Sequence, residues 1–315
     1  MGGDSDEACF RFNFDPVADR QPDTACAAQE AAVRAARQDG YPPPGTEVFP
    51  QSPAEQTPEQ LDAVELVAGV TLYKGRVTSE AASALLGNGQ LADSDLIPGT
   101  YEGGFKLWEG AADLAKFLCT EWGLTESLFT SPTDPCKALA GKKILELGCG
   151  QGLPGILAYL AGADVHFQDY NEEVLEVLTG PNLAHNRRML PPGRRKGDVR
   201  YFASDWCCMG DLMGKNLLGG NYDIILSAET IYSLDSQHSL YECMKQFLRP
   251  PHGIAYVAAK TYYFGVGGGT TAFKKLLAQE GVLEAETVAT IDDGASNKRE
   301  ILKLKFPDHI HPYFL

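Results

Sequence analysis

The residues best suited to chemistry form a glycine-rich loop, ILELGCGQGLPG, at 144–155. Gly148, Gly150 and Gly152 stand at alternate positions and Gly155 closes the segment, between apolar residues typical of a buried strand and others typical of a helix. Glycines at such a turn bring backbone N–H groups close to a ligand, because no Cβ stands in the way. The loop therefore predicts a site for a nucleotide-containing cofactor.

Two classes of cofactor use such a loop, and the glycines alone do not separate them. Gly150, Gly152 and Gly155 read as G-x-G-x-x-G, the dinucleotide pattern, and Asp169 follows at the distance expected of an acid that binds ribose hydroxyls. Glu146 lies near the end of the preceding strand, where it would repel a pyrophosphate but attract the ammonium and sulfonium groups of S-adenosylmethionine. The loop favours S-adenosylmethionine, with NAD or FAD, or a purely structural loop, as the alternatives.

Three further predicted strands also end in polar residues. Because carboxyl ends of parallel strands meet at one edge of a sheet, we expect these residues to line the same ligand crevice as the glycine loop. Asp205 could accept a hydrogen bond from the adenine amine, while Trp206 could stack on the ring or pack the rim. Glu229 follows an apolar strand, where a carboxylate is costly to bury unless it is paired or used. The candidates at these strand ends are Gln168, Asp169, Tyr170, Ser204, Asp205, Trp206, Ser227, Ala228 and Glu229.

Two other segments contain glycines beside aromatic residues. In the first, at 99–114, Trp108 and Glu109 mark a helix start after two glycines, so this segment could fold over the cofactor like a lid. In the second, at 259–273, aromatic faces could hold a planar acceptor while glycines let a peptide backbone approach. A plain strand-to-helix loop is the alternative there. The candidate substrate residues are Tyr263, Phe264, Gly265 and Gly267.

The elements that must position these residues alternate regularly between strand and helix. This alternation predicts an α/β fold with a doubly wound, mostly parallel sheet of seven strands, similar to the Rossmann fold. The last two strands, near 283–291 and 299–306, form an antiparallel pair. The other strands are expected at 143–147, 164–168, 199–203, 223–228 and 254–260, and the helices at 108–122, 153–162, 171–186, 236–248 and 269–281.

Proline and charge divide the chain into four parts. Residues 1–57 are acidic and proline-rich and are expected to be poorly ordered, and 58–98 form a small accessory segment. The regular pattern of 99–306 is expected to form one domain, which holds the glycine loop, followed by a tail at 307–315.

Composition and charge limit the partners, the location and the metal sites to be expected of this protein. The net charge of −15 argues against direct DNA binding and suits a basic protein partner. No apolar run is long enough to span a membrane, and the N-terminus lacks the order of an export signal. The eight cysteines show no C-x-x-C spacing, so reduced thiols and no metal site are expected.

Five segments carry a more specific resemblance: EGGFKLWE, ILELGCGQGLPGI, VHFQDYN, SAETIY and KTYYFGVGGG. In this order and spacing they resemble the eukaryotic histidine protein methyltransferase 1 group, also called methyltransferase-like protein 18, which belongs to the class I methyltransferases. The resemblance covers 99–306. It implies S-adenosylmethionine as cofactor, held by Leu107, Trp108, Glu109, Gly110, Ala111, Gly148, Gln168, Asp169, Tyr170, Ser204, Asp205, Trp206 and Ala228, to which the strand-end argument adds Glu146, Gly150 and Ser227.

The resemblance also implies an acceptor, a histidine of a large-subunit ribosomal protein. The absent export signal favours the cytoplasm, and a ribosomal substrate adds the nucleus, including the nucleolus. We expect a monomer. A neutral imidazole needs no strong base, so the enzyme would fix its tautomer by accepting the other N–H. Glu229 and Asp205 are the candidate acceptors. A lysine methyltransferase of the same superfamily and a non-catalytic module that binds ribosomal protein are the alternatives. Gly110, Ala111 and Ala228 depart from the group's pattern, so any cofactor contact there must use backbone atoms.

Overall fold

The computed structural model describes residues 44–50, 61–78, 81–82, 85, 100–133, 136–214, 222–294 and 297–310. All of them belong to one unit, Pro42–Leu315. What we expect of 1–43 and 51–60 lies outside the described residues. Within the described ranges, no helix combines the length and the apolar character that crossing a membrane would require.

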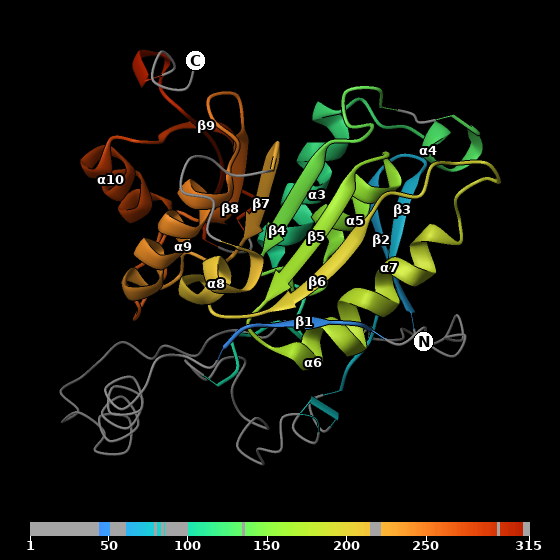
Figure 1. Ribbon diagram of the computed structural model, residues 1–315, viewed down its shortest axis with the longest axis horizontal. Coiled ribbons are helices and arrows are strands. Elements are labelled where there is room, and N and C mark those ends of the chain that lie inside the picture. The colour runs from blue at the N-terminus through green and yellow to red at the C-terminus, as the bar shows by residue number, and fades with distance from the viewer. Residues whose placement is uncertain are drawn as a thin grey trace, which may run out of the picture. The chain divides into compact units, whose positions relative to one another are not determined.

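One large sheet forms the centre of the fold (Figure 1). Its strands run in the order β1-β6-β5-β4-β7-β8-β10-β9, and the five from β6 to β8 are parallel. The chain order reverses between β4 and β7, which is the place where ligands bind in doubly wound sheets. The parallel strands are β4 (Lys143–Leu147), β5 (Asp164–Asp169), β6 (Val199–Ala203), β7 (Ile224–Ala228) and β8 (Ile254–Lys260).

The two edges of the sheet are antiparallel. β10 (Arg299–Lys305) inserts between β8 and β9 (Glu284–Ile291), which confirms the predicted antiparallel ending. At the opposite edge, β1 (Thr46–Val48) pairs antiparallel with β6. The sheet therefore has eight strands: the seven expected ones and a short strand from the segment that we predicted to be poorly ordered.

Helices cover both faces of the sheet (Figure 1). Because side chains alternate along a strand, Ile144 of β4 joins the core beneath α5, whereas Leu145 joins the core beneath α9 and α10. The first face carries α3 (Glu109–Glu121), α5 (Leu153–Leu160), α6 (Glu172–Val174), the π-helical turn η3 (Leu175–Thr179) and α7 (Gly180–Arg187); the second carries α8 (Met209–Met213), α9 (Leu234–Phe247) and α10 (Thr270–Glu280). The 3-10 turn η4 (Trp206–Cys208) precedes α8, and the short α4 (Ser127–Thr130) precedes β4.

A separate hairpin of β2 (Leu61–Val67) and β3 (Val70–Gly75) packs on α3 and α7. Asn186 of α7 exchanges two hydrogen bonds with the backbone of Tyr73, at 2.9 and 2.7 Å. The side-chain amide of Asn186 therefore bonds to β3 as the backbone of a neighbouring strand would. This contact attaches the hairpin to α7.

Candidate functional site

The glycine loop between β4 and α5 is held by side chains from the end of β5. Gly148, Gly150 and Gly152 have φ of 63°, 49° and 74°, a left-handed conformation that favours glycine. The N–H of Gly148 donates to Gln168 Oε1 at 3.0 Å, and that of Gly150 donates to Asp169 Oδ2 at 2.9 Å. The first and second strand ends therefore form one hydrogen-bonded unit, as the sequence predicted from their positions.

Close packing provides a second reason for glycine in this loop. A Cβ on Gly148 would lie 2.5 Å from Thr230 Cγ2. Thr230 is not free to turn away, because its hydroxyl bonds to Ser227 Oγ at 2.7 Å, and that serine also donates to the Leu147 carbonyl at 2.9 Å. Ser227 thus braces the loop from β7, and Ala228 beside it is half-buried.

Glu146 lies behind the loop. Its side chain is 2% exposed, and Oε2 accepts the N–H of Gly155 in the first turn of α5 at 2.9 Å. Burial raises the pKa of this carboxyl to about 8, partly offset by the bond from Gly155. From the sequence we expect Glu146 to attract the cofactor's cations, whereas its contact in the structure anchors the start of the helix.

Asp169 has capacity for a ligand. Its carboxylate accepts the N–H groups of Gly150 and Asn171, the latter at 3.1 Å, and its side chain is 4% exposed. Burial raises the pKa of Asp169 to about 6. Because an ionised carboxylate has about four acceptor positions, the backbone bonds from Gly150, Tyr170 and Asn171 leave about one position for a ribose hydroxyl. Tyr170 follows it, half-buried.

Gln168 positions the aromatic residue of the third strand end. Its Oε1 accepts from both Gly148 and the Trp206 indole, the latter at 2.9 Å, and its Nε2 donates to the Ser204 carbonyl at 2.7 Å. Asp205 caps the short 3-10 helix after β6, accepting the N–H of Cys207 at 3.0 Å. Trp206 is thereby fixed beside the glycine loop.

Glu229, at the end of β7, joins two distant segments. Its φ is 58°, and it is the non-glycine residue with positive φ in the part of the chain that the structure describes. Oε1 accepts the N–H of Gly110 at 3.0 Å, and Oε2 accepts the hydroxyl of Tyr263. Burial raises the pKa of Glu229, while Tyr263 and the nearby Lys260 oppose that rise. A strained backbone that holds a buried carboxylate is typical of functional sites.

The start of α3 explains one departure from the family pattern. A Cβ on Gly110 would lie 2.5 Å from Glu229 Oε1, so the Glu229 carboxylate can bond to the start of α3 only if residue 110 is glycine.

The other predicted residues at the start of α3 make contacts within the protein. Trp108 donates from its indole to the Gly103 carbonyl at 3.0 Å, and Glu109 forms an ion pair with Lys260 at 3.4 Å. Leu107 packs against the core, and the N–H of Ala111 donates to the Trp108 carbonyl at 3.1 Å.

The segment before α3 is bonded over the same edge of the sheet. Glu102 accepts the hydroxyl of Tyr232, and its N–H donates to Asn171 Oδ1 at 3.2 Å. Gln151 donates to the Phe105 carbonyl at 2.7 Å. The sequence suggests a lid for this segment but does not identify Tyr232, Asn171 or Gln151 as its partners. The only signal for them is that they are polar residues within FQDYN, SAETIY and the glycine loop.

The aromatic loop after β8 differs from everything above, because its large side chains face solvent. Phe264 is 63% exposed and Tyr262 is 46% exposed, and their rings form an edge-to-face pair with centroids 5.1 Å apart. Val266 is also exposed, and a Cβ on Gly267 would meet the exposed Leu234 of α9 at 3.6 Å. Tyr263 alone turns inward, to Glu229; Gly265 and Gly267 have φ of 82° and 77°.

Comparison with known proteins agrees with this geometry. A histidine protein methyltransferase 1 homolog of Mus musculus is 33% identical over 309 residues, which is 92% of this chain and 80% of that protein. The chain belongs to this family. The homolog of Dictyostelium discoideum is 42% identical over 214 residues, 68% of this chain and 61% of its own length.

The broader family is described as lysine methyltransferase, and its sequence model matches residues 99–263. EEF1A lysine methyltransferase 3 of Mus musculus is 35% identical over 144 residues, 46% of this chain and 55% of that protein. The chain is therefore an S-adenosylmethionine-dependent protein methyltransferase, and the dinucleotide alternative is wrong.

The residues at the sheet edge suit this cofactor. Hydroxyls of a ribose and the amine of an adenine are hydrogen-bond donors, and the neighbouring strand ends offer the carboxylates of Asp169 and Asp205. The indole of Trp206 offers a flat apolar face beside Gly148.

Proposed function

We propose that this protein transfers a methyl group to a ring nitrogen of a histidine in a large-subunit ribosomal protein. The observation that carries this proposal is the similarity to a histidine protein methyltransferase 1 homolog along 92% of the chain. The exposed aromatic loop beside Glu229 supports it, since an enzyme acting on a folded protein needs a surface that contacts that protein.

When bound, S-adenosylmethionine would supply an electrophilic methyl group on a sulfonium. The protein would align an imidazole with it, because neutral imidazole already carries a nucleophilic lone pair near pH 7. Alignment of this kind supplies about 7–11 kcal/mol in well-oriented reactions. No strong base is needed for the attack.

Glu229 is the better of the two candidate acceptors for the second imidazole N–H. It adjoins the aromatic loop through Tyr263, and each of its oxygens accepts one bond from the protein. Asp205 is directed instead to the backbone of its own short helix. We therefore assign the tautomer-fixing role to Glu229 and a cofactor-side role to Asp205.

The protein's charge supports a basic substrate. The chain has 42 acidic and 27 basic residues, and opposite charges accelerate the encounter of two proteins. A ribosomal protein is such a partner. We infer a monomer that meets it in the cytoplasm and nucleus, including the nucleolus.

A protein-lysine methyltransferase is the second candidate, since the description of the matching family favours it. Lysine must lose a proton before it attacks, so its rate would rise steeply in alkaline solution, whereas a histidine enzyme would reach a plateau above about pH 7.

The decisive experiment incubates the pure protein with isotope-labelled cofactor and an extract of ribosomal proteins, followed by mass spectrometry of the labelled peptide. We expect label on one histidine. Label on lysine would replace the proposal by the second candidate. Cofactor binding without any labelled protein would leave a non-catalytic module that binds ribosomal protein.

A further inference from the structure

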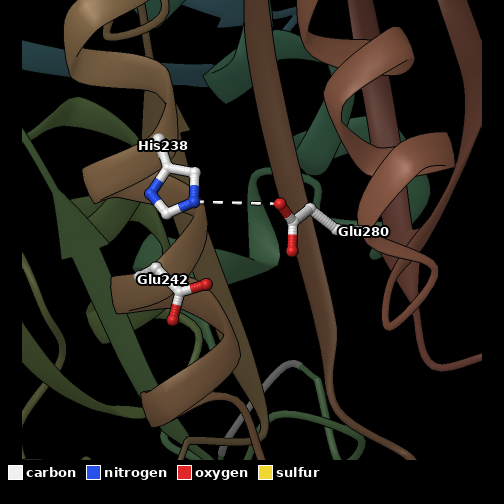
Figure 2. Close-up of side chains that lie close together, drawn as sticks. All are labelled: His238, Glu242 and Glu280. Atoms are coloured by element: carbon white, nitrogen blue, oxygen red, sulfur yellow. Dashed lines mark ion pairs between the residues drawn. The ribbon is translucent and has the colours of Figure 1, made fainter.

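A cluster of metal-ligating side chains lies on the second face of the sheet, away from the residues described above. His238 and Glu242 stand one turn apart on α9, and Glu280 comes from the end of α10; their ligand atoms all lie within 4.8 Å of one another. Figure 2 shows the His238 ring and the Glu280 carboxylate facing each other, with Nε2 and Oε1 3.8 Å apart.

Tyr241 provides a second, independent observation beside this cluster. Its side chain is fully buried, and its hydroxyl has no hydrogen-bond partner among the described residues. Its ring lies 6.3 Å from the ring of His238, which is one of the three residues of the cluster. A buried hydroxyl normally has a partner, so one that lacks it points to a missing acceptor, such as a metal-bound water.

We propose that His238, Glu242 and Glu280 bind a divalent transition-metal ion of the zinc class. One imidazole and two carboxylates form a ligand set suited to such an ion, with water completing the coordination. Magnesium and calcium are less suited, because they prefer oxygen ligands throughout.

The distances are compatible with this assignment after small side-chain movements. Zinc lies about 2.0–2.2 Å from histidine nitrogen and carboxylate oxygen, which puts tetrahedral ligand atoms about 3.4 Å apart. The His238 to Glu280 contact is 3.8 Å, and both side chains are partly exposed and so can adjust.

Lys245 would compete with the metal ion for the carboxylate of Glu242. Its ammonium forms an ion pair with Glu242, and it lies 5.1 Å from the centroid of the Tyr241 ring. An arriving cation would displace this ammonium from the carboxylate. Removing the positive charge of Lys245 should therefore strengthen metal binding, whereas loss of an unrelated surface lysine should not.

A bound ion would connect α9 to α10. Each helix begins directly after a loop of the candidate site: α9 is capped by Ser233, four residues after Glu229, and α10 begins after the aromatic loop. The metal would thereby link the first half of α9 to the far end of α10, without contacting substrate or cofactor.

The test titrates the full, untagged chain with Zn²⁺, and with Co²⁺ followed by its visible spectrum. We expect one site and a rise in the unfolding temperature, because an ion that binds only the folded state stabilises it. His238→Ala and Glu280→Gln should each weaken binding at least tenfold, Tyr241→Phe a few-fold, and Lys245→Gln should tighten it.

His252→Ala, at an exposed histidine outside the cluster, is the matched control and should change nothing. Cys207→Ser tests the exposed thiol as an alternative ligand. The proposal is overturned if His238→Ala and Glu280→Gln bind the metal as the wild type does, or if Cys207→Ser removes the site. None of these readouts depends on methyl transfer.

Discussion

The glycine loop and the aromatic loop lie at the same edge of the sheet but are built in opposite ways. Around the glycine loop, Gln168 and Asp169 are buried and bonded to backbone N–H groups within the protein. In the aromatic loop, Tyr262 and Phe264 are exposed, and their rings contact each other.

This contrast separates two kinds of recognition. A small cofactor is best held by groups already fixed in place, since ordering them on binding would reduce affinity. A protein substrate instead covers apolar surface that the free enzyme leaves exposed, and aromatic side chains contribute most to such contacts. Glu229 connects the two regions, because it bonds to Gly110 of α3 and to Tyr263 of the aromatic loop.

The largest effect, a loss of affinity for the cofactor, is expected from Gly148→Val. A side chain there would collide with Thr230 and force an unfavourable left-handed backbone. We expect cofactor affinity to fall by roughly 10³-fold or more, as the loop is displaced. Isothermal titration with S-adenosylmethionine measures it. Gly141→Val is the matched control, because Gly141 has φ of 73° but a Cβ there would meet nothing within 4 Å.

The next prediction concerns the pH dependence of stability, which tests whether Glu146 is buried behind the glycine loop. The pKa of Glu146 is about 8 in the folded protein against 4.5 for the ordinary group, so its contribution to stability is present below about pH 4.5 and is lost as pH rises through 8. Glu146→Gln has no such titration. Its stability relative to the wild type should therefore increase over this range, by about 1.4 kcal/mol for each unit of pKa difference.

Urea unfolding without cofactor, repeated across that pH range, measures the difference between the two proteins. Groups that do not interact with Glu146 titrate alike in both proteins and cancel, whereas the charge of Asp169 contributes to the raised pKa of Glu146 and so to the difference. A difference that stays constant with pH would mean that Glu146 is solvated rather than buried behind the loop.

Glu229→Gln tests the residue that connects the regions. Gln retains the shape but loses the charge, and its amide nitrogen cannot accept the imidazole N–H. We expect kcat with the protein substrate to fall by about 10²-fold, typical of a lost proton-handling group, while cofactor affinity changes little. Asp205→Asn should affect cofactor binding more than kcat. The reverse pattern would exchange the two roles.

The smallest effect is expected from Phe264→Ala on the acceptor side. Removing an exposed aromatic that the substrate covers should raise KM for the protein about tenfold, without changing the affinity for cofactor. Steady-state kinetics checks this. Phe49→Ala removes another exposed phenylalanine, outside the loop, and should leave KM unchanged. Equal effects of both variants would argue against a substrate surface at the aromatic loop.

Most of the regular structure could be predicted from local patterns. The strands at 143–147, 199–203 and 254–260 have the bounds expected, because apolar runs bordered by glycine or polar residues determine them locally. The π-helical turn Leu175–Thr179 lies where the sequence predicts plain helix. Thr179 donates to the Gly150 carbonyl at 2.7 Å, a contact with a distant loop that no periodicity reveals.

The site was predictable only in part, because some of its contacts join residues that lie far apart in the sequence. Strand-end positions brought Gln168, Asp169 and Trp206 together correctly, since topology alone determines that edge. The bond between Glu229 and Gly110 spans 119 residues of sequence. The sequence therefore predicted a buried carboxylate at Glu229 but could not identify Gly110 as its hydrogen-bond donor. Likewise, cysteine spacing predicted no metal site, whereas the proposed ligands are one histidine and two glutamates from two helices.

The short strand β1 has a practical consequence for handling this protein. It covers β6, which would otherwise be the outer strand of the parallel sheet, and a Cβ on Gly45 would lie 2.6 Å from Ser204 Oγ. A shortened protein that starts after β3 would expose the unpaired backbone of β6 beside the cofactor residues. Exposed edges of this kind pair with one another and cause aggregation. Expression of the catalytic region should therefore begin ahead of Thr46.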